Sequence, residues 1–142
     1  MNILIVEDDA CCAESVGEII EKWGHNVDQA KTGTEALKRF TKNIYDLVLL
    51  DIFLPDIQGH ELIPQFKKLC PETGIVTMTG YNSWELEMQV RKEGVLYYMI
   101  KPFETKDLKC LLDHLSIYLQ KKRSTITGQG FQSFLKGSTV NS

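Results

Sequence analysis

The sequence predicts an α/β protein in which five helices cover a doubly wound, five-stranded parallel sheet. Short apolar runs alternate with longer stretches of helical periodicity, five times along the chain. Parallel strands need crossover connections, and helices usually supply them. The apolar runs are continuous, which is typical of strands that are buried on both faces. With 142 residues, the chain is long enough for one domain with a substantial core.

The first half of the chain contains three predicted strands and three predicted helices. Ile3–Val6 is a continuous apolar strand, and the amphipathic helix after it, Ala10–Trp23, ends at Gly24. Thr34 is the expected N-cap of the second helix, and Pro71 stops the third. The other elements of this half are a weak strand at 27–30, a helix at 34–41, the strand LVLL at 47–50, directly before Asp51, and a helix through 62–69.

The second half repeats the alternation and then changes character. Strands are expected at 75–78 and 97–100, and helices at 84–93, between Ser83 and Gly94, and at about 105–120. The predicted domain therefore covers residues 1–121. Residues 122–142 begin with basic residues and are then rich in Ser, Thr and Gly, so we expect a flexible tail or the start of a linker. Phe131, Phe134 and Leu135 leave a short docking helix as the alternative.

Composition excludes several classes of protein. A net charge of −3 and a pI of about 5.6 argue against a dedicated nucleic-acid binder. No apolar stretch approaches the roughly 18 residues that span a bilayer, and no secretion signal is evident, so we expect a cytoplasmic protein. The four cysteines lack paired zinc-ligand spacing, and we expect them to be small packing residues.

Polar residues follow the predicted strands at the points where the strands end. Because parallel strands end at the same edge of a sheet, these side chains should meet where such folds bind ligands. Each residue alone has an ordinary explanation, and Asp9 is best explained as the N-cap of the first helix. The residues are Glu7, Asp8 and Asp9 after the first strand, Asp51 after the third, Thr79 after the fourth and Lys101 after the fifth.

The chemistry of this group indicates phosphoryl transfer. Clustered carboxylates without a matching basic cluster suit a hard divalent cation, and Mg²⁺ fits best because it binds one or two carboxylates together with water and phosphate. The metal and Lys101 would neutralise charge on a transferred phosphoryl group, and the Thr79 hydroxyl would donate to it. One of the carboxylates could then be the nucleophile.

These residues and their order resemble the response-regulator receiver domains of two-component signalling, the chemotaxis regulators among them. The resemblance rests on VEDD, DIFLPDIQG, MTG and YMIKPF and runs from Asn2 to about Gln120. It implies a flavodoxin-like fold with strand order 2-1-3-4-5. It also implies a phosphoacceptor switch in phosphorelay signal transduction rather than an enzyme. Its own chemistry would be limited to self-phosphorylation from a donor and slow self-dephosphorylation.

The resemblance assigns the phosphorylation site residue by residue. Asp51 matches the phosphoacceptor, which takes a phosphoryl group from a histidine kinase to form an aspartyl phosphate. Glu7 and Asp8 match the acidic pair that holds Mg²⁺, together with Asp51 and the backbone carbonyl of Phe53. The family more commonly has two aspartates where this chain has Glu7 and Asp8.

The resemblance also assigns a switch. Thr79 matches the hydroxyl that moves toward the phosphoryl group, Lys101 matches the lysine that pairs with that group, and the bond before Pro102 is expected to be cis. Tyr98 matches the aromatic residue that turns inward on activation, although a permanently buried core aromatic is an alternative. The switch would remodel the surface formed by the fourth helix, the fifth strand and the fifth helix.

Phe53 and Tyr81 occupy the positions that tune self-dephosphorylation in the family. Phe53 lies two residues after Asp51, and Tyr81 lies two residues after Thr79. Two aromatic side chains offer no carboxylate or amide to orient water, so our hypothesis is slow self-dephosphorylation. Gly80 is small, as an open path for the phosphodonor requires.

Two other classes of protein use a similar sheet. A flavin-binding electron carrier would need a phosphate-binding loop after the first strand, where EDDACC would repel the phosphate. A phosphatase of the haloacid-dehalogenase type is expected to carry a second Asp at the position of Phe53.

The partners that the receiver assignment implies are proteins. They are a histidine kinase or phosphotransfer protein as donor, and an output domain or partner protein docked on the switch surface. Dimerisation on phosphorylation is a further expectation, and no direct contact with nucleic acid or membrane is expected.

Overall fold

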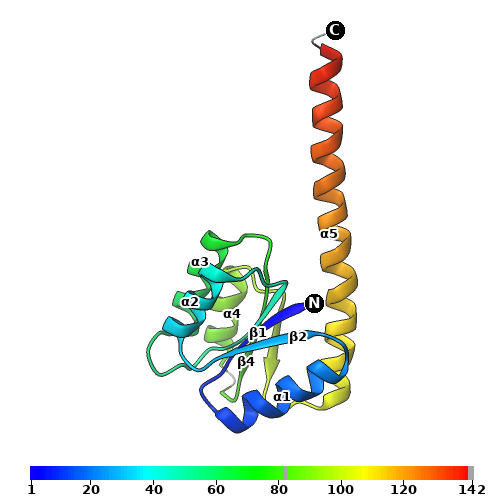
Figure 1. Ribbon diagram of the computed structural model, residues 1–142. Helices are drawn as coiled ribbons and strands as arrows, with labels where there is room; N and C mark the ends of the chain where they lie inside the picture. The colour runs from blue at the N-terminus through cyan, green and yellow to red at the C-terminus, as the bar shows by residue number, and fades with distance from the viewer. Residues whose placement is uncertain (82, 141–142) are drawn as a thin grey trace. The chain divides into compact units, whose positions relative to one another are not determined.

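The structure of the chain, a computed structural model, describes residues 1–81 and 83–140, with side chains described up to residue 124. The chain divides into two compact units, Met1–Glu104 and Thr105–Ser142. The first unit contains a five-stranded sheet with the strand order β2-β1-β3-β4-β5 (Figure 1). All four neighbouring pairs of strands are parallel, which confirms the predicted fold class and strand order.

The five strands lie within a residue or two of the predicted runs. β1 is the central element, because Ile3 pairs with Val27 of β2 on one side and with Leu47 of β3 on the other. Residues Ile3–Val6 are fully buried, as are Leu47–Leu50. The strands are β1 (Asn2–Val6), β2 (Asn26–Ala30), β3 (Leu47–Asp51), β4 (Gly74–Thr79) and β5 (Tyr97–Ile100).

Four helices connect these strands: α1 (Ala10–Lys22), α2 (Gly33–Lys42), α3 (Gly59–Leu69) and α4 (Trp84–Lys92). Asp9 caps α1 by accepting a hydrogen bond from the Cys12 amide at 3.2 Å, and Ser83 caps α4, as predicted. The predicted cap of α2 is wrong. Thr32 accepts the hydrogen bond from the Glu35 amide, because Gly33 is already helical and Thr34 lies within the first turn.

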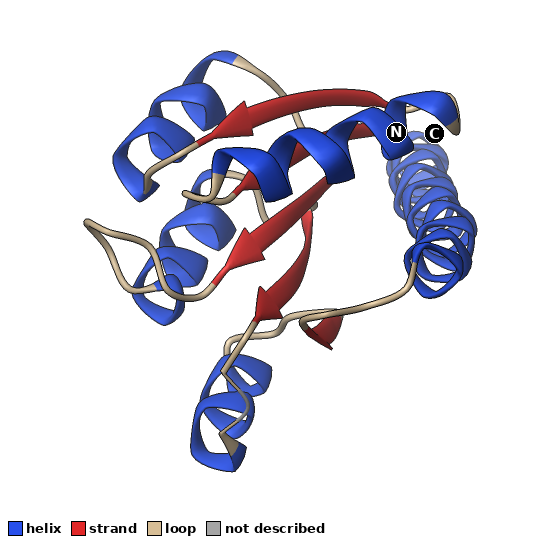
Figure 2. Cartoon of the chain, turned by 90° about the horizontal axis from the view of Figure 1, so that it is seen from below, coloured by secondary structure: helices blue, strands red, loops and turns tan. Residues whose placement is uncertain are grey.

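The helices cover both faces of the sheet. Leu4 and Val6 of β1 belong to a core cluster that also contains buried residues of α2, α3 and α4. Ile5, which alternates with them, points to the other face, where its side chain lies next to Gly17 of α1. Figures 1 and 2 show α1 on one side of the sheet and the other three helices on the opposite side. The strands are therefore buried on both faces, which explains their uninterrupted apolar sequences.

The second unit is the single helix α5 (Thr105–Val140). The predicted leucine stripe is confirmed in part, since Leu108, Leu112, Leu115 and Leu119 are buried. The prediction that the helix ends near Gln120 is wrong. Residues 121–140 contain no proline, and isolated glycines weaken a helix by about 1 kcal/mol each without ending it. The assignment of 122–142 as a tail or linker stays a prediction, and the side chains of Phe131, Phe134 and Leu135 lie outside the described ones.

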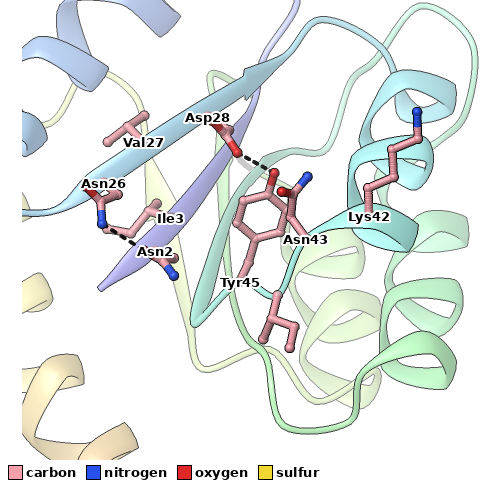
Figure 3. Close-up of a pocket in the computed structure, with 9 residues that line it drawn as sticks. Asn2, Ile3, Asn26, Val27, Asp28, Lys42, Asn43 and Tyr45 are labelled. Carbon is pink, nitrogen blue, oxygen red and sulfur yellow. Dashed lines mark hydrogen bonds between the residues drawn. The ribbon is translucent and has the colours of Figure 1, made fainter.

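A pocket of about 500 Å³ lies at the amino-terminal edge of the sheet and is lined in part by polar side chains (Figure 3). It is formed by the first residues of β1 and β2 and by the segment that precedes β3. The Tyr45 hydroxyl donates a hydrogen bond of 2.6 Å to Asp28, and Asn26 donates one of 3.0 Å to Asn2. The backbone amide of Asn2 donates to Asp46 at 2.6 Å. Burial and the hydrogen bond to Asp28 raise the pKa of Tyr45 to about 12.

The structure also bears on the cysteines and on membrane-spanning helices. The expectation that the cysteines are small packing residues is confirmed for Cys70, which is half-buried and packs against the core cluster, and is wrong for Cys11 and Cys110, which are exposed. Among the described residues, no helix is both long and apolar enough to cross a membrane.

Candidate functional site

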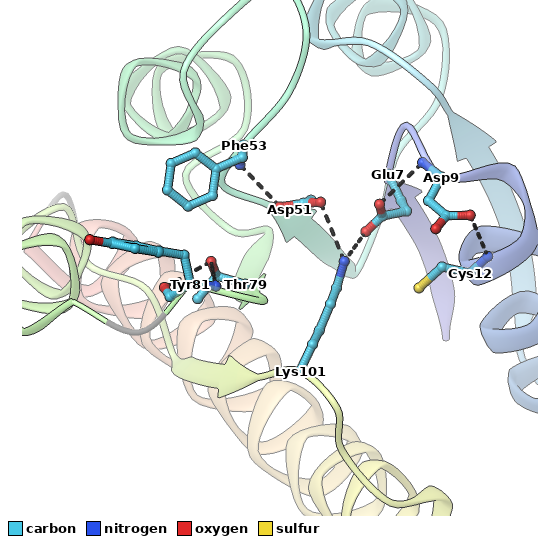
Figure 4. A network of polar contacts seen from close by, with 8 residues as sticks. All are labelled: Glu7, Asp9, Cys12, Asp51, Phe53, Thr79, Tyr81 and Lys101. Atoms are coloured by element: carbon cyan, nitrogen blue, oxygen red, sulfur yellow. Dashed lines mark hydrogen bonds and ion pairs between the residues drawn. The ribbon is translucent and has the colours of Figure 1, made fainter.

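The carboxyl-terminal edge of the sheet gathers the polar residues that the sequence places after its strands (Figure 4). Glu7 directly follows β1, Asp51 and Thr79 are the last residues of β3 and β4, and Lys101 directly follows β5. Because the strands are parallel and in close register, their last residues meet at one edge. The structure brings Glu7, Asp51 and Lys101 into contact, whereas the hydroxyl of Thr79 bonds to Tyr81.

Three carboxylates lie close together at this edge. Glu7, Asp8 and Asp51 each have a carboxylate oxygen within 4.8 Å of the others. Glu7 is 2% exposed and Asp51 is 7% exposed, whereas Asp8 is exposed to solvent. Like charges at this separation repel, and burial strengthens the repulsion, so the cluster requires a positive charge.

Lys101 supplies one such charge. Its ammonium group forms a close ion pair with Glu7 Oε2 and lies 3.3 Å from Asp51 Oδ2. Burial alone would lower the pKa of Lys101, but the carboxylates of Glu7 and Asp51 outweigh burial and raise it. Burial raises the pKa of Glu7, and the Lys101 ammonium opposes that shift. Sequence analysis missed the Glu7 contact, because it paired Lys101 only with a phosphoryl group.

The cluster has the composition of a site for a hard cation. Three carboxylates face one ammonium group, so the site carries an excess of negative charge even with Lys101 in place. All the atoms that could bind a metal here are oxygens, the ligand type that Mg²⁺ prefers. Softer metals favour sulfur or nitrogen ligands. Glu7, Asp8 and Asp51 are therefore the residues of this chain that could hold Mg²⁺.

The backbone after β3 orients the Asp51 carboxylate. The amide of Phe53 donates a hydrogen bond of 3.0 Å to Asp51 Oδ1, while Oδ2 faces Lys101. Each oxygen of the carboxylate therefore has a different partner, and the side chain has a defined orientation.

Two aromatic rings lie beside Asp51. Phe53 and Tyr81 contact each other edge to face, with their ring centroids 5.9 Å apart (Figure 4). Both side chains are partly open to solvent, at 45% and 64% exposed. The two positions that the sequence singled out thus form one aromatic pair.

The predicted switch residues occupy different environments. Thr79 is fully buried, and its hydroxyl donates to the Tyr81 carbonyl at 3.1 Å and accepts from the Tyr81 amide at 3.0 Å. Tyr98 is only 5% exposed and belongs to the main core cluster. Within the described part of the chain its hydroxyl has no hydrogen-bond partner, and burial raises its pKa. The Lys101–Pro102 bond is cis, as predicted.

Asp56 has a role that sequence analysis missed. It lies in the loop between β3 and α3, yet its carboxylate accepts hydrogen bonds from the first turn of α2, at Gly33 and Thr34. An aspartate after a proline indicates a turn, and nothing in the sequence connects it to residues 22 and 23 positions earlier.

Comparison with known proteins agrees with this geometry. The family model described as "Response regulator receiver domain" matches residues 3–113. The transcriptional regulatory protein ZraR of Escherichia coli (strain K12) is 32% identical over 113 residues, which are 80% of this chain but only 26% of that protein. The chain thus spans about a quarter of that relative.

Shorter relatives are matched over nearly their whole length. Sporulation initiation phosphotransferase F of Bacillus subtilis is 31% identical over 85% of this chain and 95% of its own. The crystal structure of the response regulator TrrA from Thermotoga maritima, in complex with Mg(2+)-BeF, superimposes with a TM-score of 0.72 and 32% identity. That match covers 80% of this chain and 97% of the other.

Proposed function

The chain belongs to the response regulator receiver domain family, whose members act as phosphoacceptor switches, and on that premise we propose that Asp51 is its phosphoacceptor. The observation that carries the proposal is the position of Asp51, beside the Lys101 ammonium group and close to the acids Glu7 and Asp8. A carboxylate oxygen of Asp51 attacks the phosphorus of a phosphohistidine on a histidine kinase or phosphotransfer protein. The P–N bond breaks, the imidazole nitrogen leaves, and an aspartyl phosphate forms.

The residues around Asp51 provide the charge that this reaction needs. Glu7, Asp8, Asp51 and the backbone carbonyl of Phe53 would hold Mg²⁺, which when bound neutralises negative charge on the phosphoryl oxygens. Lys101 donates to a phosphoryl oxygen from its position beside Asp51. Its contact with Glu7 supports this role, because it keeps the ammonium group charged at the site.

Phosphorylation then biases Thr79 and Tyr98. The new group adds about −1.5 to −2 charge and three acceptor oxygens, so the Thr79 hydroxyl exchanges its hydrogen bonds with Tyr81 for one to the phosphoryl group. Tyr98 responds to the space that Thr79 leaves. The unpartnered hydroxyl of Tyr98 supports a movable side chain, and its place in the core cluster supports the alternative of a permanent core residue. If the environment of the Tyr98 ring stayed the same after phosphorylation, Tyr98 would be a permanent core residue and not a switch.

The aromatic pair sets the lifetime of the aspartyl phosphate. Phe53 and Tyr81 contact each other beside Asp51, and neither side chain can orient a water molecule as a carboxylate or amide would. We therefore infer slow self-dephosphorylation.

The signal passes to an output domain or partner protein through a surface that includes α4 and β5. Large apolar side chains are exposed on these elements, which is typical of docking surfaces. The surface as the family has it also includes the fifth helix, and dimerisation on phosphorylation is one form that docking could take. The exposed residues are Trp84 (70%), Met88 (38%), Tyr97 (48%) and Ile100 (43%).

The decisive experiment is intact mass spectrometry after incubation with acetyl phosphate and Mg²⁺. We expect one added phosphoryl group in the wild-type protein and in Asp113→Asn, an exposed aspartate of α5 that pairs only with Lys109 among the described contacts. We expect no adduct in Asp51→Asn or after removal of Mg²⁺.

The other outcomes are also informative. An adduct that persists in Asp51→Asn would place the phosphoryl group on another residue and refute the assignment. No adduct, together with binding of beryllofluoride that Asp51→Asn abolishes, would indicate a selective phosphodonor. No response to either reagent would mean that the fold serves binding alone.

A further inference from the structure

The Asp56 carboxylate joins two parts of the chain that are distant in sequence. Its Oδ1 accepts from the Gly33 amide at 2.8 Å, and its Oδ2 accepts from the Thr34 amide at 2.9 Å and the Thr34 hydroxyl at 2.7 Å. Oδ1 also accepts from the Ile57 amide at 2.9 Å. We call the contacts of Asp56 with Gly33 and Thr34 the Asp56 clasp. It ties the loop after β3 to the first turn of α2.

An apolar contact supports the clasp. A side chain at Gly33 would lie 3.0 Å from Ile57 Cβ, so the half-buried Ile57 packs directly on the backbone of the first turn of α2. The tip of the loop, at Asp56 and Ile57, is therefore held by both polar and apolar contacts.

The base of the same loop is closed on itself. The Gly59 amide donates to the Ile52 carbonyl at 2.7 Å, and Phe53 and Gln58 form an isolated antiparallel bridge. A Cβ at Gly59 would lie 2.6 Å from Ile52 Cα, so only glycine permits this closure. A loop that is closed at its base and held at its tip has little conformational freedom, and the bridge with Gln58 places Phe53 at that base.

Phe53 connects the loop to the phosphorylation site. Its amide is the donor that orients Asp51 Oδ1, and its carbonyl is the expected backbone ligand of Mg²⁺. A small displacement of a reacting or ligating group costs considerable rate or affinity, because the reactants must already be aligned.

We propose that Asp56 is a positioning residue, which through its clasp to α2 fixes the backbone at Phe53 and thereby sets the metal affinity and phosphorylation rate of Asp51. The inference rests on the proposed function and adds a residue outside the phosphorylation site to it. It also makes the start of α2 part of the support of that site.

The ionisation of Asp56 is consistent with a permanent clasp. Desolvation by itself would raise the pKa of Asp56, but the hydrogen bonds from Thr34, Gly33 and Ile57 lower it to about 2. The carboxylate therefore keeps its negative charge near neutral pH, at a helix N-terminus, where such a charge is favourable.

The test compares Asp56→Ala with Thr32→Ala, a matched loss of a cap on the same helix. Thr32 caps α2 from within its own segment, so its loss weakens α2 and leaves the loop contacts in place. We expect Asp56→Ala to weaken Mg²⁺ binding and slow phosphorylation by acetyl phosphate about tenfold, the range found for residues that orient metal ligands. Thr32→Ala should bind Mg²⁺ and accept phosphate as the wild-type protein does.

Partial variants guard against a folding defect. Asp56→Asn keeps one acceptor for the amides, and Thr34→Val removes only the hydroxyl donor, so both should fall between the wild-type protein and Asp56→Ala. If Asp56→Ala and Thr32→Ala lowered metal affinity and rate equally, Asp56 would be an ordinary helix cap and the proposal would be overturned.

Hydrogen exchange separates this inference from the proposed function. Faster exchange of the Phe53 and Gly59 amides, neither of which bonds to Asp56, in Asp56→Ala but not in Thr32→Ala would support the clasp even if the wild-type protein accepted no phosphate. Unchanged exchange at both amides would overturn the clasp, even if Asp51 proved to be the phosphoacceptor.

Discussion

The two edges of the sheet use polar residues in opposite ways. At the carboxyl-terminal edge, the buried acids Glu7 and Asp51 share one cation, Lys101, and lie close enough to repel each other. At the amino-terminal edge, polar groups are satisfied in pairs, as in the hydrogen bond from Tyr45 to Asp28. Both edges belong to the same strands, so the strands themselves do not cause the difference.

The difference distinguishes residues that serve chemistry from residues that serve stability. A crowded set of buried charges lowers stability unless a ligand compensates it, and such sets persist where function requires them. At the other edge, hydrogen-bonded pairs that are neutral or carry one charge satisfy the polar groups of both partners, so they need no ligand for stability. Substitution of single residues at either edge tests this difference.

The largest effect is expected from Asp51→Asn. This variant should lose the phosphoryl adduct entirely while gaining up to about 1 kcal/mol of unfolding free energy without Mg²⁺, because one of two neighbouring buried charges is removed. The Asn side chain keeps an acceptor for the Phe53 amide. Intact mass and urea unfolding measure the two effects, and a variant less stable than the wild-type protein would contradict the reasoning about repulsion.

The next effect concerns the lifetime of the aspartyl phosphate. Phe53→Asn combined with Tyr81→Glu should accelerate its decay about tenfold or more, because each factor of ten requires only about 1.4 kcal/mol of barrier. Decay of the adduct after removal of the donor is the measurement. Ile44→Asn, which changes a 79% exposed residue at the opposite edge, is the control and should leave decay unaltered. Equal decay in the double variant and the wild-type protein would refute the shielding hypothesis.

A smaller effect is expected at the amino-terminal edge. Tyr45→Phe should lower the unfolding free energy by about 1 kcal/mol, because Asp28 loses a buried donor, and should leave phosphorylation unchanged. Tyr97→Phe, at a 48% exposed ring, is the matched control. A change in phosphorylation rate in Tyr45→Phe would show that the two edges are coupled.

The same residue predicts a dependence on alkaline pH. The pKa of Tyr45 is raised to about 12 in the fold, from a value of 10.0 without the protein environment. Its contribution to stability is therefore complete below pH 10 and lost as the pH rises toward about 12. The stability difference between the wild-type protein and Tyr45→Phe should shrink over that interval.

The smallest effect is expected for the Asp56 clasp in acid. Because the pKa of Asp56 is lowered from 3.8 to about 2, its contribution is present above pH 3.8 and lost as the pH falls toward 2. Asp56 is exposed, so salt screens part of this contribution, and we expect about 0.5 kcal/mol. Urea unfolding of the wild-type protein and Asp56→Asn should differ near neutral pH and converge in acid. A constant difference would mean that the charge of Asp56 does not matter.

Sequence analysis predicted the carboxyl-terminal edge well, because local patterns determine it. An apolar run followed by Asp51 or Lys101 identifies both a strand and the residue at its end, and parallel topology then brings those ends together. The wrong or missing predictions concern contacts between residues that are far apart in sequence, and positions where the local sequence signal is weak. Nothing local relates Asp56 to Gly33, and neither Thr32 nor Thr34 is a distinctly better cap until the first helical residue is known.

The long helix α5 illustrates the other source of error. Its extension past Gln120 follows from the lack of a strong stop signal, whereas sequence analysis relied on a change in composition. Composition describes the solvent preference of a segment, and the backbone conformation depends on propensity and caps.

The central position of β1 has a consequence for how the protein folds. β1 is synthesised well before one of its two partner strands, β3, where Ile3 pairs with Leu47. Until β3 leaves the ribosome, the edge of β1 that pairs with it stays without a partner strand. The nascent chain should therefore aggregate most readily between completion of α2 and completion of β3, and a chaperone that shields short apolar strands would act in that interval.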